Sequence, residues 1–529
     1  MLSQRESLGC GMLRRSFLGF LGYSATASLL APWLSTRALA RQDAHLIAPA
    51  SYDHLPRWRG FNLQEKINLR RNLPFQEWDF DVIAEWGFDF VRLPMDYRIW
   101  TIAPGEYREQ PLREIDQAVA WARARGIHVN LCLHRAPGYT VAKPPETLNL
   151  WADGPDGDNA RRQFAAQWRL FAQRYRGIPS SELSFNLVNE PSGTSGDAYL
   201  RAARMAVAAI REQDPARLII ADGLLDSFFL RPANELLPLK VAQSMRGYAP
   251  GELTLYHASW VKGADAYPEP TWPMLANLNG FLYGDVKKPL QSPLIIESTF
   301  TEETQLRIHV QAVSSTATLM VRADNKLIFE RRFAPGAGSG EWTASVFHPE
   351  WNAYQATYDL DCVANIPAGS QEVLIMVTAG DWLRFSELRF IAKGGSAPLA
   401  SLKATSTWGI RQKRYRLDAH GTLLPADGQA AYDQQTLWRD FIEPWRQLAT
   451  KGVGVHVGEW GVHNQTPHAV ALAWMKDCLA NWKQAGWGWA LWDLRGPTGP
   501  LDSRRADVKY VNFRGHQLDQ AMLELLKAG

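Results

Sequence analysis

The sequence has few cysteines and little net charge. It has only four cysteines in 529 residues, and these are widely scattered, which excludes a dense disulfide framework. None of them has the spacing of zinc ligands, and we expect no metal ion and no cofactor. The net charge is only +3, with acidic and basic residues mixed throughout, so a nucleic acid is a poor candidate for the partner.

Long apolar runs are also missing. The most apolar stretch, residues 20–34, falls short of the roughly 20 residues that a membrane span needs. It follows the pair Arg14-Arg15 and precedes Ala38-Leu39-Ala40, an order that predicts a twin-arginine export signal over residues 1–40. We therefore expect a periplasmic or extracellular protein that is free of the membrane once the signal is removed, and a monomer. An N-terminal membrane anchor is the alternative.

From about Trp58 the chain alternates short β-rich runs with segments of helical periodicity, which predicts βα units and a parallel sheet. Eight such units predict a closed (β/α)₈ barrel. An open doubly wound sheet is the structural alternative, but no glycine-rich phosphate loop follows an early strand. The expected helices are 112–125, 161–176, 198–213 and 468–484, and the expected strands are 60–63, 90–94, 128–134, 183–190, 218–222, 253–257, 453–459 and 487–492.

One region interrupts this pattern. Between residues 298 and 395 the helical periodicity gives way to alternating β patterns separated by turn signals, which predicts a small antiparallel β-sandwich. We expect it to be inserted between two parts of the barrel, 41–297 and 396–529. It could bind carbohydrate, with Trp342, Trp351 and Trp382 as candidate platforms, or it could be a spacer or a wall of the cleft.

Two strand-like runs end in a glutamate. Residues 184–191 finish in Asn189-Glu190-Pro191, and residues 453–461 carry Glu459 in the context Gly-Glu-Trp-Gly. Polar residues at the carboxyl ends of barrel strands are typical of catalytic sites. Two such carboxyls, roughly 5 Å apart, are what double-displacement cleavage of a glycosidic bond requires. Glu297 also ends an apolar run, but it lacks both contexts and is interpreted as structural.

These strand ends together resemble glycoside hydrolase family 5, the retaining β-glycanases. The resemblance extends over Trp58 to Glu297 and Trp408 to Leu526. Its motifs are Gly60-Phe61-Asn62-Leu63, Val91-Arg92-Leu93-Pro94, residues 133–139, Asn189-Glu190-Pro191, Gly458-Glu459-Trp460-Gly461 and Trp489-Ala490-Leu491-Trp492.

The resemblance implies a role for each matching residue. Glu190 matches the family's acid/base, Glu459 its nucleophile, and Arg92 the arginine near that nucleophile. The implied substrate-binding residues are Asn189, at the hydroxyl next to the anomeric carbon, His134 and His257, in the subsite where the bond breaks, and Trp492, as a stacking floor.

The chain departs from the family near the sixth strand. There the family has His-x-Tyr, whose tyrosine donates to the nucleophile, whereas this chain has His257-Ala258-Ser259-Trp260. Tyr256 and Tyr267 are possible substitutes.

The resulting hypothesis is a secreted retaining endo-β-glycanase that hydrolyses a β-1,4-glucan of the cellulose type, with a β-glycan as its only expected partner. An exo-acting glucosidase or mannosidase, or a mannanase, on the same barrel is the first alternative. A non-catalytic glycan-binding protein is the second.

Overall fold

The computed structural model describes residues 49–226, 229–274, 278–395, 397–406, 408–418, 421, 423–426 and 432–529. The predicted export signal lies outside these residues. None of the described helices is both long enough and apolar enough to span a bilayer.

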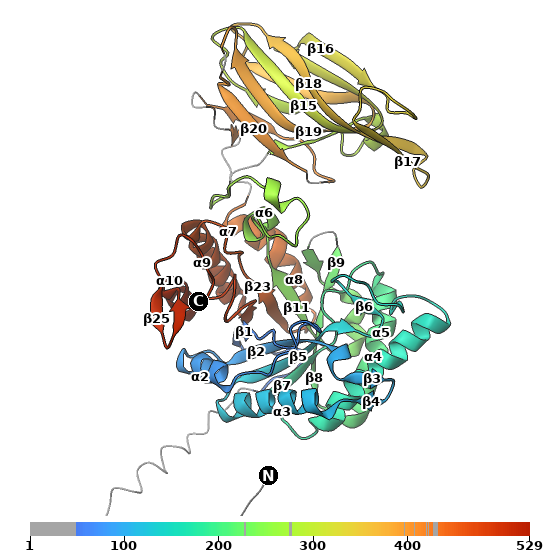
Figure 1. Ribbon diagram of the computed structural model, residues 1–529, viewed down its shortest axis with the longest axis vertical. Helices are drawn as coiled ribbons and strands as arrows, with labels where there is room; N and C mark the ends of the chain where they lie inside the picture. The colour runs from blue at the N-terminus through green and yellow to red at the C-terminus, as the bar shows by residue number, and fades with distance from the viewer. Residues whose placement is uncertain are drawn as a thin grey trace, which may run out of the picture. The chain divides into compact units, whose positions relative to one another are not determined.

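Eight parallel strands close into a barrel with helices around it (Figure 1). Their order is β2-β1-β24-β23-β11-β8-β7-β5, and pairing of β2 with β5 completes the ring. The predicted closed barrel is confirmed. Its strands are β1 (Arg59–Asn62), β2 (Phe90–Asp96), β5 (His128–Ala136), β7 (Leu183–Asn186), β8 (Leu218–Asp222), β11 (Ala242–Gly247), β23 (Val455–Trp460) and β24 (Trp489–Leu491).

The helices pack on the barrel through one apolar face. In α4, Phe164, Trp168 and Phe171 are buried at helical spacing, as the sequence predicted. The long helices α3, α5 and α9 also bury apolar residues at helical spacing. The helices are α2 (Glu77–Glu85), α3 (Glu109–Ala124), α4 (Pro155–Arg174), α5 (Gly196–Gln213), α6 (Gly251–Thr254), α7 (Gln434–Leu437), α8 (Glu443–Ala449), α9 (His468–Ala485) and α10 (Gln520–Ala528).

The predicted sixth strand is wrong. Residues 253–257 do not form a strand: Gly251–Thr254 is the short helix α6, and the sixth barrel strand is β11, eleven residues earlier than expected (253 − 242 = 11). Gln243, Ser244 and Arg246 put three polar side chains in six residues of this strand, and all are buried inside the protein. A strand with so many polar residues lacks the apolar pattern by which buried strands are recognised.

A second sheet of eleven strands, mostly antiparallel, lies in the chain between β11 and β23. It runs from Leu278 to Pro425, so the predicted limits of 298 and 395 are wrong at both ends. Its strands are β12 (Leu278–Asn279), β13 (Phe281–Tyr283), β14 (Leu294–Glu297), β15 (Thr304–Ala323), β16 (Lys326–Phe333), β17 (Ala344–His348), β18 (Ala353–Ile366), β19 (Glu372–Ala392), β20 (Ala400–Thr405), β21 (Arg414–Leu417) and β22 (Leu423–Pro425).

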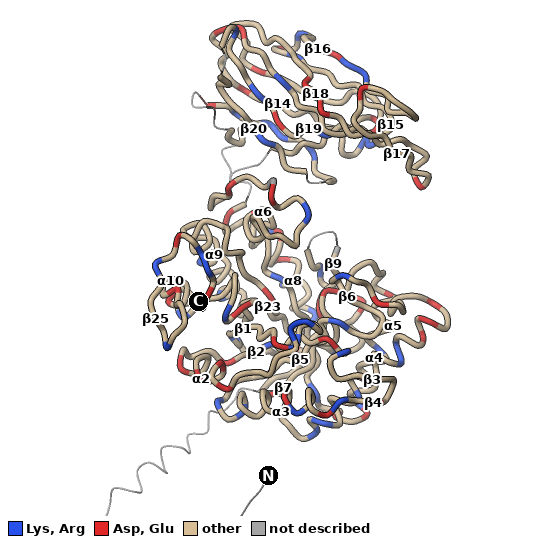
Figure 2. The backbone as a smooth tube through the Cα atoms, viewed as in Figure 1, with Lys and Arg blue, Asp and Glu red and all other residues tan. Residues whose placement is uncertain are grey.

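This sheet domain is organised by β15 and β19, which pair along almost their whole length. The first half of β15 also pairs with β18 and its second half with β16, while β19 pairs with β14 at one end and β20 at the other. Alternate residues of both strands are buried in a core of their own. Acidic and basic residues are interspersed over the barrel and over the sheet domain (Figure 2).

Candidate active site

The two glutamates predicted to act together come from opposite parts of the chain to one site. Glu459 lies near the end of β23, and Glu190 follows β7 by four residues. Arg246, near the end of β11, contacts both carboxylates: its Nε donates to Oε1 of Glu190 at 3.0 Å, and its Nη2 lies 3.1 Å from Oε1 of Glu459. One guanidinium therefore bridges the two acids.

Arg92, on β2, is the second guanidinium of the site and is buried. Its Nη1 donates to Glu459 Oε1 at 2.5 Å, and its Nη2 donates to Asn189 Oδ1 at 2.9 Å. Its Nε donates to Asn186 Oδ1 at 3.0 Å, which fixes the plane of the group. The structure thus places Arg92 beside Glu459, whose Oε1 is contacted by two guanidinium groups.

Glu190 has one guanidinium partner, Arg246, and is close to the negative charge of Glu459. Burial raises the pKa of its carboxyl to about 7, and the negative charge of Glu459 contributes to this rise, against the effect of Arg246. Its backbone is in the left-handed region, with φ of 46°, and its N–H donates to Asp222 Oδ2 at 2.8 Å. Such a conformation is costly for a residue with a side chain and is typical of functional sites.

The charges of the site do not cancel when every group is ionised. Glu190, Glu459 and Asp222 contribute three negative charges, and Arg92 and Arg246 contribute two positive ones, which leaves −1 (2 − 3 = −1). Asp222 is fully buried and pairs closely with Arg246 Nη2. Since an uncompensated buried charge is expensive, one proton on this cluster is favoured, and Glu190 is the carboxyl whose pKa is raised.

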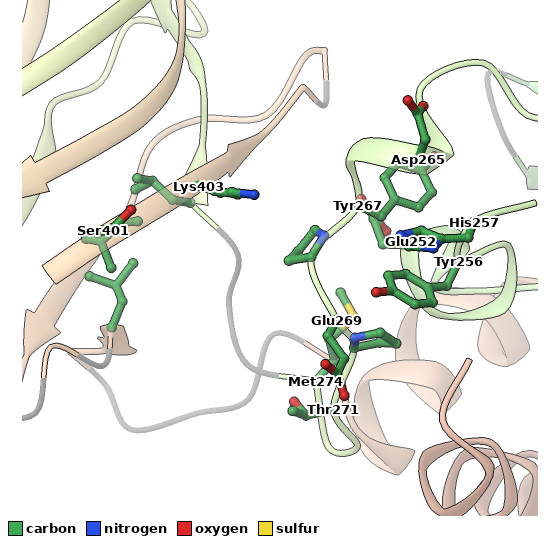
Figure 3. Close-up of a pocket in the computed structure, with 15 residues that line it drawn as sticks. Glu252, Tyr256, His257, Asp265, Tyr267, Glu269, Thr271, Met274, Ser401 and Lys403 are labelled. Atoms are coloured by element: carbon green, nitrogen blue, oxygen red, sulfur yellow. The ribbon is translucent and has the colours of Figure 1, made fainter. Parts of the chain in front are cut away.

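Arg246 and Tyr248 contact Glu459 but were not predicted from the sequence. The Tyr248 hydroxyl donates to Glu459 Oε2 at 3.5 Å. Arg246-Gly247-Tyr248 stands at the end of the true sixth strand, where the resembling family has His-x-Tyr. The sequence signal for this pair was a tyrosine, Tyr248, two positions after a polar residue, Arg246, at a strand end. It was not recognised because the sixth strand was placed at residues 253–257. The suggested substitutes Tyr256 and Tyr267 lie in the loop after α6 (Figure 3).

A β-bulge and a glycine let Arg246 reach this position. The pairing of β11 with β23 shifts register between Met245 and Arg246. A Cβ on Gly458, just before Glu459, would lie 2.3 Å from Ser244 Oγ and 3.2 Å from Arg246 Nη1. Bulges next to active sites re-aim side chains, and here the bulge places the guanidinium between the two acids.

Asn189 is fully buried and is fixed by both arginines. Its Oδ1 accepts from Arg92 Nη2 and from Arg246 Nη2, at 2.9 and 2.8 Å. Its Nδ2 has no hydrogen-bond partner within the described part of the chain. A buried donor rarely stays unpaired, so this N–H group is the unsatisfied donor of the site.

His134 and Trp492 lie together, whereas His257 does not join them. The rings of His134 and Trp492 have centroids 5.8 Å apart, and burial with the nearby Arg92 charge lowers the pKa of His134 to about 3, so its ring is neutral. His257 is in the loop after α6, with its ring stacked on Tyr256 at 4.0 Å (Figure 3). Its predicted place at the end of a barrel strand is therefore wrong.

Two other ionisable residues, Glu297 and Cys132, have surroundings that suit a structural role. Glu297 belongs to β14 of the sheet domain, where it pairs with Arg414 at 2.6 Å. Cys132 is buried and its Sγ lies 2.9 Å from Arg92 Nη2, with its pKa raised to about 12 by burial. Within the described ranges, no three His, Cys, Asp or Glu side chains are grouped as a metal site would need.

A closed parallel barrel with two guanidinium-bound glutamates at the carboxyl ends of two of its strands indicates a glycoside hydrolase. The comparisons with known proteins agree and are more specific: residues 56–250 match the family described as Cellulase (glycosyl hydrolase family 5).

Individual relatives point the same way. Endoglucanase C of Acetivibrio thermocellus is 34% identical over 149 residues, which cover 28% of this chain and 42% of that protein. A probable glucan 1,3-beta-glucosidase A of Emericella nidulans is 33% identical over 173 residues, covering 31% and 41%. The chain thus spans about two-fifths of the length of these relatives. A solved structure described as a glycoside hydrolase is 27% identical, with a TM-score of 0.56, covering 89% of this chain and 99% of that one.

Proposed function

We propose that the protein is a secreted retaining endo-β-glycanase that hydrolyses β-1,4-linked glucan, with Glu459 as nucleophile and Glu190 as acid/base. The observation that carries this proposal is the bridge made by Arg246, whose neighbouring nitrogens contact one oxygen of each glutamate at 3.0 and 3.1 Å. Oxygens held by one guanidinium lie close together, which favours the short separation of a retaining pair over the roughly 6.5–9.5 Å of an inverting pair.

The first step forms a bond between a Glu459 oxygen and the anomeric carbon. The glycosidic C–O bond breaks, and the proton of Glu190 passes to the leaving oxygen. The opposed environments suit these roles, because Glu459 receives donors from Arg92, Arg246 and Tyr248, while the pKa of Glu190 is raised to about 7.

In the second step Glu190, now ionised, takes a proton from water. The water oxygen bonds to the anomeric carbon, and the bond to Glu459 breaks, so the configuration at that carbon is retained. Asn189 supplies its unpaired Nδ2–H to the neighbouring hydroxyl of the sugar, a contact that strengthens in the transition state. Trp492 offers an aromatic face to the same sugar, and the neutral His134 beside it offers a polar edge.

The decisive experiment removes each glutamate separately. Glu459→Ala and Glu190→Ala are each expected to lower kcat by several orders of magnitude. Azide should restore activity to both through products of opposite anomeric configuration: the α-glycosyl azide from Glu459→Ala and the β-glycosyl azide from Glu190→Ala. Near-normal activity in either variant would refute the assignment.

Exo action is the second candidate, because one group of relatives is named as probable glucan 1,3-beta-glucosidases. Incubation with a long soluble glucan separates the two: endo cleavage lowers the viscosity early, whereas exo cleavage releases monosaccharide with little change in viscosity.

Export by the twin-arginine route is part of the proposal and rests on Arg14-Arg15 and the sequence that follows. A full-length chain with both arginines replaced by lysine should remain in the cytoplasm of a bacterial host, and its continued export would contradict the signal.

A further inference from the structure

The sheet domain contains a cavity that the proposed catalytic chemistry does not use. Its volume is about 660 Å³, which is within the range of about 300–1,000 Å³ found for small-molecule sites. Its lining comes from β13, β15, β18 and β19, from the short 3-10 helix Asp285–Lys287, and from the segments that carry Trp351 and Trp408. It lies where the pairing of β15 with β19 shifts register, between Ser314 and Ala317. Such irregularities open a sheet and redirect its side chains.

Three tryptophans line this cavity, and two of them are unusually exposed. Trp351 is 61% exposed and Trp408 is 51% exposed, although large aromatic residues are normally well buried. Trp382 is the third, and its ring meets that of Trp408 edge to face, at 5.9 Å and 82°.

The position of Trp408 is fixed although its ring is exposed. Phe281 and Tyr283 meet its ring edge to face, at 5.1 and 5.2 Å. The backbone N–H of Gly409 donates to the Tyr283 hydroxyl at 2.7 Å. An aromatic ring that is held in place and yet left open to solvent is preorganised for a ligand, since little side-chain freedom is lost on binding.

Polar groups complete the lining. Asp381 lies next to Trp382, and its Oδ1 is buried without a hydrogen-bond partner in the described structure. Gln355 and Lys287 add an amide and an ammonium group. A buried, unpartnered carboxylate oxygen calls for a donor, and a hydroxyl group supplies one.

We propose that this cavity is a second glycan-binding site, which takes a short segment of a neutral β-linked glucan. The apolar faces of such a sugar pack on the faces of Trp351 and Trp408, and its equatorial hydroxyls bond to Asp381 and Gln355. The lining contains one acidic residue, Asp381, and one basic residue, Lys287, whose charges offset each other, so it favours a neutral ligand over a charged one. The choice of glycan rests on the proposed function, because the same chain would hold this polymer while the barrel cleaves it.

The candidate platform Trp342 lies apart from this site and provides a matched control. Its ring packs on Tyr358, and its Nε1 donates to the carbonyl of Gly338 at 3.1 Å. Trp342→Ala therefore removes a tryptophan from the same domain without touching the cavity.

The test uses the full chain carrying Glu190→Gln, so that the ligand is not hydrolysed. Isothermal titration with cellohexaose is expected to show two binding events per chain. Adding Trp351→Ala and Trp408→Ala should remove one event or weaken it about tenfold or more, whereas adding Trp342→Ala should leave both. On the catalytically intact chain, the same pair should weaken binding to insoluble cellulose and leave turnover of a small chromogenic glycoside unchanged.

Each outcome separates the two proposals. A single binding event that is unaffected by the Trp351 and Trp408 changes would overturn the second site, whatever the activity of the barrel. Two events in a chain that hydrolyses no β-glycan would refute the proposed function and retain this site. Sedimentation that shows a dimer which the two changes dissociate, with no glycan bound at the cavity, would make the surface an interface between copies and overturn the inference.

Discussion

Replacing Glu190 by glutamine should stabilise the folded chain above neutral pH while abolishing activity. Burial raises the pKa of Glu190 from 4.5 to about 7, so ionising this carboxyl costs more in the folded chain than in the unfolded one. A group with a raised folded pKa leaves stability intact below its unfolded pKa and lowers it as pH rises through the folded pKa. The free energy of unfolding therefore falls progressively between about pH 4.5 and about pH 7, and the loss is complete above that range.

The magnitude follows from the shift. At about 1.4 kcal/mol per pKa unit, a rise from 4.5 to about 7 corresponds to about 3 kcal/mol. Glutamine keeps the shape of the side chain and an oxygen that can accept from Arg246 Nε, but it carries no charge. Glu190→Gln should then gain about 3 kcal/mol of unfolding free energy near pH 8 and almost none near pH 4.5.

Urea unfolding of the two chains at both pH values measures the effect. Glu182→Gln is the matched control, because Glu182 forms a surface pair with Arg123 at 2.5 Å and should change stability by less than about 1 kcal/mol at either pH. If Glu190→Gln is destabilising near pH 8, or shifts stability equally at both pH values, the pairing with Arg246 outweighs burial and the reasoning is refuted.

Three further predictions follow from the same cluster. The alkaline limb of the pH profile of kcat/KM should have an apparent pKa near 7, set by Glu190, and a limb above pH 9 would contradict that assignment. Arg246→Lys keeps the positive charge but cannot contact both glutamates in the same way, so kcat/KM should fall about 10- to 100-fold; unchanged kinetics would show that the bridge is dispensable. Tyr248→Phe should lower kcat about tenfold with little effect on KM, and steady-state kinetics showing a change in KM alone would assign the hydroxyl to substrate binding.

The sequence predicted the barrel because seven of its eight strands have clear apolar runs bounded by helices of regular periodicity. The remaining strand, β11, which is the sixth of the barrel, was not recognised because three of its six residues are buried polar groups. Sequence patterns report which residues avoid water, and a strand that uses its inner face for chemistry does not follow them. Because the sixth strand was predicted at residues 253–257, His257 was assigned to the site and Arg246 was overlooked.

The limits of the sheet domain were predicted too narrowly for a related reason. Leu278–Asn279, Phe281–Tyr283 and Leu294–Glu297 are strands of two to four residues, too short for an alternating pattern to stand out. Trp408, assigned to the barrel on the resemblance, belongs to the cavity of the sheet domain. Its role depends on rings from β13 and β19, which only the fold brings to it.

The bridge between Met274 and Tyr432 has a consequence for engineering. The two backbones exchange hydrogen bonds of 2.8 and 3.1 Å across 158 positions of sequence (432 − 274 = 158), so the chain leaves the barrel and returns to it at one point. Excising residues 275–431 and rejoining the ends through a few glycines would keep this contact, whereas a cut at 298 and 395 would separate β19 from its partners β13, β14 and β20, which lie outside the excised segment. The backbone bridge between these two residues is thus the natural junction at which the sheet domain could be exchanged for that of another enzyme.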